Sequence, residues 1–526
     1  MVADIPELRH YIAQHLDLDA LKAFSLVCKA WYLDAQPILW SHFECEVPEE
    51  CSVSLVKHAL WLDAIRKNAI LCKHILYIGY KEPIAPEICD VLLDRCHSVV
   101  SIMMCISAWQ FRGPVGCWEE TLRPLIEQNR ITLRQLDLHL AEDLPVTFLP
   151  SLLASLPHLR SLVLFADTMM VENVFAILDG CPSSLELLVL DITLTRRNEL
   201  DQGVSVNDSD YSSILSVAKP LQLKSFHMPY SDIQGTMEAI LSRLVAHSLQ
   251  DFRIDSAYCL RITPTVRDAI WRLTSLHVQG LQFGHERTLP GILEATHPHQ
   301  LRRVNVSSMT TECTAKLIEM QHQSLETLTV HFEKGHTGAL ADILATCGRL
   351  KRLTFCWPLV NIGTLIDPQK PWVCTELEFL EGCFGLPPPN EPHVPDPLAS
   401  DKSVDVTASR RIEEQFMRCL GRLTNLRCIV RKPAIYYDLM AGKWVDTGMM
   451  EWSLASGLEH LHGLVNLQTF KVLDQGPRKW IGVPEMTFIK QHWHGLKEMV
   501  CNDLGDIDVR KWLATEWAEL KASILK

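Results

Sequence analysis

The chain has 526 residues, of which 47% are hydrophobic and 21% charged, and its formal net charge is −13 at pH 7. A single hydrophobic core stops growing at roughly 250–300 residues, so the chain must form either several domains or one extended repeat array. The hydrophobic content excludes a largely disordered chain, and the negative charge disfavours a nucleic-acid binder, because such proteins carry a basic surplus.

The cysteines and the N-terminal residues indicate the compartment. Eighteen cysteines are scattered through apolar segments and none belongs to a C-x-x-C pair, which is typical of buried thiols in a reducing environment. Asp4 and Glu7 interrupt the region where a secretory signal would begin. The longest uncharged stretch, residues 98–111, is shorter than the roughly 18 apolar residues that a membrane-spanning helix needs. We therefore expect a soluble intracellular protein of the cytoplasm or nucleus.

The N-terminal segment predicts three short helices. Its apolar residues recur at helical spacing between residues 4 and 40. Pro6 suits a first helical turn, Asp17 or Asp19 can cap the second helix, and Pro37 is expected to end the third.

This segment resembles the F-box family. The resemblance rests on residues 5–8 (Ile-Pro-Glu-Leu), on Ile12 and Leu16, on residues 27–32 (Val-Cys-Lys-Ala-Trp-Tyr), and on Leu39-Trp40. It implies a helical trio that inserts an apolar face into the Skp-family adaptor of a cullin-RING ubiquitin ligase. A domain of about 40 residues cannot bury all its apolar side chains in its own core, so the surplus needs a partner. The alternative is that the helices only cap the first repeat. The expected adaptor-binding residues are Ile5, Pro6, Leu8, Ile12, Leu21, Val27 and Trp31.

The rest of the chain repeats one phrase, apolar-x-x-apolar-x-apolar. Between Leu133 and Leu350 successive phrases begin 26, 26, 38, 26, 24, 28, 24 and 25 residues apart, near the 20–29 period of leucine-rich repeats. The region resembles that family, in its irregular ribonuclease-inhibitor or cysteine-containing type, although the Asn or Cys that normally follows the phrase is mostly absent. The phrases begin at Leu133, Leu159, Leu185, Leu223, Leu249, Leu273, Leu301, Leu325, Leu350, Leu426, Leu467 and Leu496.

The period predicts an α/β leucine-rich-repeat solenoid, with parallel strands on the concave side and helices on the convex side, preceded by the three-helix domain. Helical apolar spacing between the phrases supports this fold. A polar segment, 195–210, interrupts the array and is either a tolerated insertion or an accessible binding segment. The expected divisions are an F-box-like domain (1–45), a linker with degenerate first repeats (46–132), leucine-rich repeats (133–385), a Pro-rich loop (386–410), and C-terminal repeats with a cap (411–526).

The motifs of the commonest enzymes are absent from the sequence. It has no Walker-type phosphate loop, no G-x-G-x-x-G, no G-x-S-x-G and no H-E-x-x-H. Histidine pairs such as His297 and His299 lack further ligands at metal-binding spacing. We therefore expect no enzymatic activity, no cofactor and no metal.

We expect the binding site on the face of the strands that points away from the core. The third and fifth residues of each phrase, together with the residue that follows the phrase, should form this face. These positions mix both signs of charge, which suits a protein or peptide partner. Arg253, Arg303 and Arg352 form a candidate anion site, because guanidinium groups bind carboxylate or phosphate bidentately, although Asp251 and Asp255 can neutralise Arg253. An ordinary solvent-facing sheet is the alternative. The predicted target-binding residues are Asp251, Arg253, Asp255, His277, Arg303, Asn305, His331 and Arg352.

Two functions are compatible with these patterns. The first is the substrate-recognition subunit of an SCF-type E3 ubiquitin ligase, whose partners would be a Skp-family adaptor, through it a cullin-RING ligase, and an unknown target protein. The second is a leucine-rich-repeat scaffold that recruits no ligase. Neither involves nucleic acid or a membrane.

Overall fold

A computed structural model gives the structure of the chain. It describes residues 6–45, 63, 75, 77–80, 92–106, 117–140, 146–195, 220–228, 236–254, 260, 262–278, 288–332, 336, 338–386, 406–432, 435–438, 443–446, 450–473, 481–501, 506–517 and 519–523. The chain divides into two compact units, the first formed by residues 1–254 and 263–269 and the second by residues 255–262 and 270–526. Most of the polar segment 195–210 and of the Pro-rich loop 386–410 lies outside the described residues.

The first unit opens with the three expected helices, α1 (Pro6–His15), α2 (Leu18–Ser25) and α3 (Lys29–Leu39). The Asp17 carboxylate accepts a hydrogen bond from the Ala20 backbone N–H at 2.8 Å and so caps α2, as predicted. The prediction that Pro37 ends α3 was wrong, because the helix continues to Leu39. A proline in the last turn removes only one backbone hydrogen bond there, which the helix tolerates.

The first unit then forms one parallel sheet in which the strands pair in chain order. Its strands are β1 (His42–Cys45), β2 (Tyr77–Tyr80), β3 (Ser101–Ile106), β4 (Gln135–Leu140), β5 (Ser161–Met170), β6 (Leu187–Thr195), β7 (Ser225–Met228) and β8 (Asp251–Ile254). The connecting helices are α6 (Cys117–Gln128), η3 (Val146–Phe148), α7 (Leu149–Ala154), α8 (Val171–Gly180), α10 (Thr236–Leu241) and α11 (Pro264–Ile270).

The second unit repeats the same plan. Its parallel strands are β9 (Ser275–Val278), β10 (Arg303–Met309), β11 (Thr327–Phe332), β12 (Arg352–Asn361), β13 (Phe379–Gly385), β14 (Cys428–Arg431), β17 (Thr469–Val472), β18 (Glu498–Cys501) and β19 (Lys521–Ser523). A separate antiparallel hairpin joins β15 (Ile435–Asp438) to β16 (Lys443–Asp446). The helices are α12 (Thr288–Ala295), α13 (Thr311–Gln321), α14 (Ala339–Thr346), α15 (Ile362–Leu365), α16 (Val406–Gly421), η5 (Leu454–Ser456), η6 (Leu458–Gly463), α17 (Val483–His492) and α18 (Ile507–Glu516).

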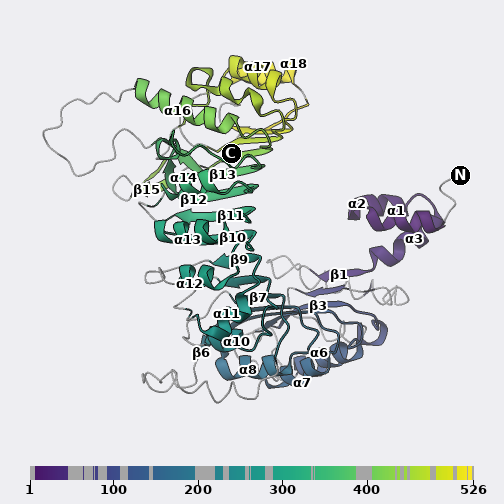
Figure 1. Cartoon of the computed structure of the whole chain (residues 1–526). Helices are drawn as coiled ribbons and strands as arrows, with labels where there is room; N and C mark the ends of the chain where they lie inside the picture. The colour runs from purple at the N-terminus through teal and green to yellow at the C-terminus, as the bar shows by residue number, and fades with distance from the viewer. Residues whose placement is uncertain are drawn as a thin grey trace. The chain divides into compact units, whose positions relative to one another are not determined.

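Every predicted phrase coincides with a strand that begins at its third residue. The leucine that opens each phrase is buried, and side chains of the strand then alternate between the core and the opposite face. Helices α6, α7 and α8 lie on one side of the strands of the first unit, and α12, α13 and α14 on one side of the strands of the second (Figure 1). The predicted α/β leucine-rich-repeat fold is therefore confirmed.

Strand β13 is one of those that the predicted phrases do not include. Its phrase begins at Leu377, but glycine occupies the last apolar position, at residue 382, which hid the pattern. Gly382 pairs with Phe355 on β12, and a β-carbon built on it would lie 2.4 Å from the Phe355 ring. The phenyl group therefore fills the space that a side chain at residue 382 would take.

Buried amides partly replace the missing ladder of asparagines or cysteines. The Gln321 side chain, at the end of α13, accepts hydrogen bonds from the backbone N–H groups of Gln300 and Leu301, each at 3.0 Å. Its amide nitrogen donates to the His297 carbonyl at 3.2 Å. In the first unit, Asn129 accepts from the Val99 N–H at 2.9 Å. Each amide thus satisfies backbone groups of the preceding repeat that would otherwise be buried without a partner.

We expect Gly382→Ala to lower the free energy of unfolding by about 1–3 kcal/mol, because the new methyl group overpacks against Phe355. Denaturant titration followed by tryptophan fluorescence measures the change. Gly348→Ala is the matched control, because the β-carbon there would lie 3.7 Å from the nearest atom, the Val373 carbonyl oxygen. Equal stability of the two variants would contradict this account of β13.

Candidate functional site

The sheet face opposite the helices carries aligned rows of side chains in the second unit. The first row contains Ser275, Arg303, Thr327, Arg352 and Phe379, which occupy paired positions on β9 to β13. These side chains are half-buried or exposed, whereas their strand neighbours Leu276, Val304, Leu328, Leu353 and Leu380 are buried. The predicted orientation of the third residue of each phrase is therefore confirmed for these strands.

Two of the predicted target-binding arginines lie in this row. Arg303 and Arg352 are both exposed, and each pairs in register with Thr327 on the strand between them. The Arg352 guanidinium lies 4.5 Å from the centre of the Phe379 ring. The structure thus brings Arg303 and Arg352 to the same patch of the face.

The second row begins with His277 and Asn305, which are half-buried and pair with each other. His331 lies further along β11 and is also half-buried. Burial lowers the pKa of His331, and the positive charge of Lys432 lowers it further, which favours the neutral imidazole.

The carboxylates of this face are paired with lysines. Glu381 forms an ion pair with Lys432, and Glu498 pairs with Lys471 at 3.0 Å. Each of these two carboxylates is therefore neutralised by a lysine of a neighbouring strand region.

Two further predicted target-binding residues, Asp251 and Arg253, belong to the end of the first unit. Asp251 and Arg253 lie on β8, where Arg253 is exposed and Asp251 accepts a hydrogen bond from the Ser225 hydroxyl at 3.5 Å. Asp255 lies outside the described residues. Arg253 belongs to the first unit, whereas Arg303 and Arg352 belong to the second, so the joint site of the three arginines stays a prediction.

The first unit presents acidic and aromatic groups on the same face. The His139 ring stacks on Phe165 at 4.1 Å between centroids. Asp137 accepts a hydrogen bond from the Gln135 amide at 3.0 Å, and burial raises the pKa of its carboxyl group. Burial lowers the pKa of His139, while the charge of Asp191 opposes that shift. These half-buried polar groups are further candidates for contact with a partner.

The helical trio exposes much of its apolar surface. Six of the twelve exposed large apolar side chains among the described residues lie in the trio, including Leu26 at 84% and Val27 at 60% exposure. These two residues join α2 to α3. The six are Tyr11, Ile12, Leu26, Val27, Tyr32 and Leu33.

The trio also has a small core of its own, formed by Ala13, Leu21, Phe24 and Ala35. Among the predicted adaptor-binding residues, Leu21 is only 3% exposed and lies in this core, because α2 packs on α3 through it. Trp31 is half-buried and stacks on Phe24 at 4.2 Å.

The other predicted adaptor-binding positions differ in exposure. Ile12 and Val27 are exposed and Leu8 is half-buried. Pro6 begins α1, and Ile5 lies outside the described residues. Sequence reasoning missed Leu26, whose exposure follows from its place at the end of α2.

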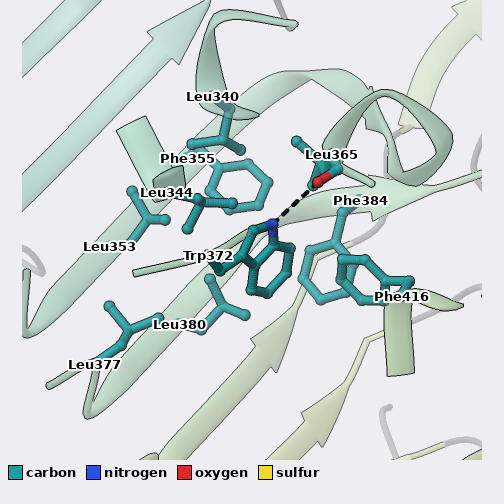
Figure 2. Close-up of a pocket in the computed structure, with 10 residues that line it drawn as sticks. All are labelled: Leu340, Leu344, Leu353, Phe355, Leu365, Trp372, Leu377, Leu380, Phe384 and Phe416. Atoms are coloured by element: carbon teal, nitrogen blue, oxygen red, sulfur yellow. Dashed lines mark hydrogen bonds between the residues drawn. The ribbon is translucent and has the colours of Figure 1, made fainter. Parts of the chain in front are cut away.

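An apolar cavity in the second unit is too small for a ligand. Figure 2 shows Trp372 among Phe355, Phe384 and Phe416, with its indole N–H donating to the Leu365 carbonyl at 3.0 Å. The enclosed space measures about 10 Å³, close to the minimum for one water molecule, and no polar surface lines it. This region is packed core.

A wider hollow of about 310 Å³ lies between residues 365–372 and α16. Two of its cations are neutralised, since Lys370 pairs with Asp342 at 2.7 Å and Arg418 pairs with Glu414 at 2.5 Å. The hollow is open to solvent and carries no concentrated charge.

The described residues contain no group of three or more histidine, cysteine or acidic side chains placed to hold a metal ion. Burial raises the pKa of Cys347 and of Cys374 to about 12, so these two thiols are unreactive at neutral pH. Among the helices of the described chain, none is both long and apolar enough to cross a membrane.

One buried ionisable cluster joins α16 to the strand region. Glu413 is 5% exposed and accepts a hydrogen bond from the Glu451 backbone N–H at 3.0 Å. Burial raises its pKa from 4.5 to about 7, although Arg410 and the fully buried Arg431 favour its charged form. The neighbouring carboxylate of Glu451 lies 3.8 Å from Arg410. Glu413 and Arg431 are buried, whereas Arg410 is exposed, so the Glu413 carboxyl group bears on stability rather than on binding.

The Glu413 carboxyl group predicts a pH dependence of stability. Its folded pKa lies above its unfolded pKa, so the folded state is favoured when the carboxyl group is protonated. This stabilisation is fully present below pH 4.5 and is lost as the pH rises through about 7. The loss is at most about 3 kcal/mol. We expect Glu413→Gln to flatten the decrease of the denaturation midpoint between pH 5 and 7.5, whereas Glu376→Gln, at an exposed position, keeps the wild-type slope. Identical slopes in all three proteins would be the contrary result.

Two solved structures are similar to the chain at low sequence identity. No protein-family model matches the chain, and no curated protein matches it. A chain in the crystal structure of a TLR13–ssRNA13 complex is similar with a TM-score of 0.34 and 11% identity, over 82% of this chain and 65% of that chain. This chain thus spans less than two thirds of that protein's length. A chain in the crystal structure of the yeast Rad7 and Elc1 complex gives a TM-score of 0.37 and 13% identity, over 70% and 94% of the two chains.

Proposed function

We propose that this chain is a non-enzymatic substrate-recognition subunit of an SCF-type ubiquitin ligase. In this proposal the helical trio, as an F-box, binds a Skp-family adaptor, and the repeat array holds a target protein. The observation that carries the proposal is the unpartnered apolar surface of a trio that has its own core and the F-box sequence pattern.

The exposed apolar side chains favour a protein partner for the trio. Leu26 and Val27 protrude between two helices and contribute little to the core formed by Leu21 and Phe24. Complete burial of such a side chain contributes roughly 1.5–3 kcal/mol. A helix-in-groove partner would gain this free energy without reorganising the trio.

In this proposal the predicted residues of the trio have two different roles. Leu21 and Trp31 would hold the helices together from within, since Leu21 is buried and Trp31 stacks on Phe24. Ile12, Leu26 and Val27 would then contact the adaptor directly. We assign no bond-making step to the chain. Its contribution would be effective concentration, because a target bound to the repeats is held near the ubiquitin-loaded enzyme.

A second function, a scaffold whose trio only caps the repeats, also has an observation in its favour. Helix α3 leads directly into β1, the first strand of the sheet, and the Ser41 carbonyl accepts a hydrogen bond from the Tyr77 N–H at 2.9 Å. The trio is therefore continuous with the array, as a cap would be.

Adaptor binding separates the two functions. We expect Leu26→Asp with Val27→Asp to weaken the affinity for a purified Skp-family adaptor by about 30-fold for each side chain replaced, since apolar anchors at a desolvated interface commonly contribute about 2 kcal/mol each. Isothermal titration calorimetry measures the affinity. The thermal midpoint should stay unchanged, because both side chains are exposed.

The matched control is Gln14→Glu with Lys22→Gln, which adds the same negative charge at exposed positions of the trio. It should bind the adaptor normally, because an exposed ion pair such as that of Lys22 with Asp19 contributes little. The capping function stands instead if the wild-type chain does not bind the adaptor. It also stands if the Leu26→Asp, Val27→Asp variant binds the adaptor as tightly as wild type does. Trp31→Ala is a poorer test, because it would also loosen the trio.

A further inference from the structure

We propose that Arg303 and Arg352 form an anion-binding pair for an extended segment of the target protein that carries a phosphate group or clustered carboxylates. This inference rests on the proposed role of the repeat array in holding a target. It names the chemical class that the second unit recognises.

The register of the sheet sets the distance between the two arginines. Arg303 on β10 and Arg352 on β12 both pair with Thr327 on β11. Two strand spacings separate their backbones by about 10 Å. Both side chains are exposed and long enough to meet over the half-buried Thr327, which lies on the strand between them. The spacing suits a single compact anion bound from two sides.

Arg352 is held in place before any ligand arrives. Its guanidinium lies 4.5 Å from the centre of the half-buried Phe379 ring, on the next strand. A guanidinium over an aromatic face keeps its outer N–H groups available to an anion. Such positioning reduces the entropy lost when a ligand binds.

The charges around the pair leave it without a carboxylate partner in the part of the chain that the structure describes. Among the described residues, no ion pair involves Arg303 or Arg352, whereas the nearby Glu381 pairs with Lys432. Glu326, which precedes Thr327, is engaged by Lys351 at 3.4 Å. Two uncompensated guanidinium groups therefore stand on a chain whose formal net charge is −13.

The fold does not require arginine at these positions. In the equivalent row of the first unit, β4 to β8 carry Gln135, Ser161, Leu187, Ser225 and Asp251, none of which is a cation. This position of the phrase therefore accepts side chains of several kinds. The two arginines are therefore free to serve binding.

A peptide fits this patch better than a nucleic acid. Among the described residues of this row on β9 to β13, the positive charge consists of Arg303 and Arg352. The neighbouring row offers neutral groups such as Asn305, Thr329 and Thr354. Neutral donors and acceptors at this spacing suit a peptide backbone, whereas a long polyanion needs a continuous basic track.

The test compares two double variants of the full-length chain. Arg303→Gln with Arg352→Gln removes the pair. Arg302→Gln with Lys351→Gln removes the same charge from the adjacent residues, the exposed Arg302 and the half-buried Lys351, which already face Glu326. The probes are fluorescein-labelled peptide libraries with randomised flanks and a fixed centre of serine, phosphoserine or two glutamates, together with an oligouridine. Fluorescence anisotropy gives the affinities at two salt concentrations.

We expect the wild-type chain and the Arg302/Lys351 variant to bind the phosphoserine or the glutamate library at least 10-fold more tightly than the serine library. The Arg303/Arg352 variant should lose that preference. The relative affinities of the two anionic libraries identify phosphate or carboxylate as the ligand. Equal losses in both variants, no preference over serine, or tighter binding of oligouridine would each overturn the proposal. Adaptor affinity, measured on the same preparations, should be unaffected, so failure of the anion site is distinguishable from failure of the ligase function.

Discussion

Each repeat of this protein can satisfy its backbone and bury its apolar side chains only against the repeat before it and the repeat after it. The carbonyl of the second residue in a phrase shows the constraint. The Arg302 carbonyl, for example, accepts hydrogen bonds from the N–H groups of both Glu326 and Thr327, each at 2.8 Å. The same double contact recurs from repeat to repeat and keeps the register constant. A constant register places residues of one phrase position side by side.

This alignment explains both the core and the candidate binding face. On the core side it forces neighbouring side chains to share one volume, so that Phe355 is accommodated only because residue 382 is a glycine. On the other face it aligns the side chains at one phrase position across neighbouring strands, so that Arg303 and Arg352 lie in one row with Thr327 between them. A side chain in this protein therefore depends most on residues about one repeat away.

The helical trio differs from the repeats because it is too small to bury most of its apolar side chains. Its core consists of a few side chains around Leu21 and Phe24, and the rest of its apolar residues remain at the surface. A globular domain of that size cannot cover more. The trio thus has a small core of its own and still exposes apolar surface, whereas the strand face of the second unit that carries Arg303 and Arg352 is mainly polar.

The sequence by itself determined the repeat period, the strand positions and the side-chain alternation, because these depend on local spacing of leucines that must all reach one core. It also predicted the three helices and the Asp17 cap, which are local features. It could not find β13, because the loss of the last apolar residue is compensated by Phe355 of another repeat. Nor could it separate Leu21, which packs inside the trio, from Val27, which remains exposed. Only the tertiary structure decided these points, because burial and pairing depend on residues distant in the chain.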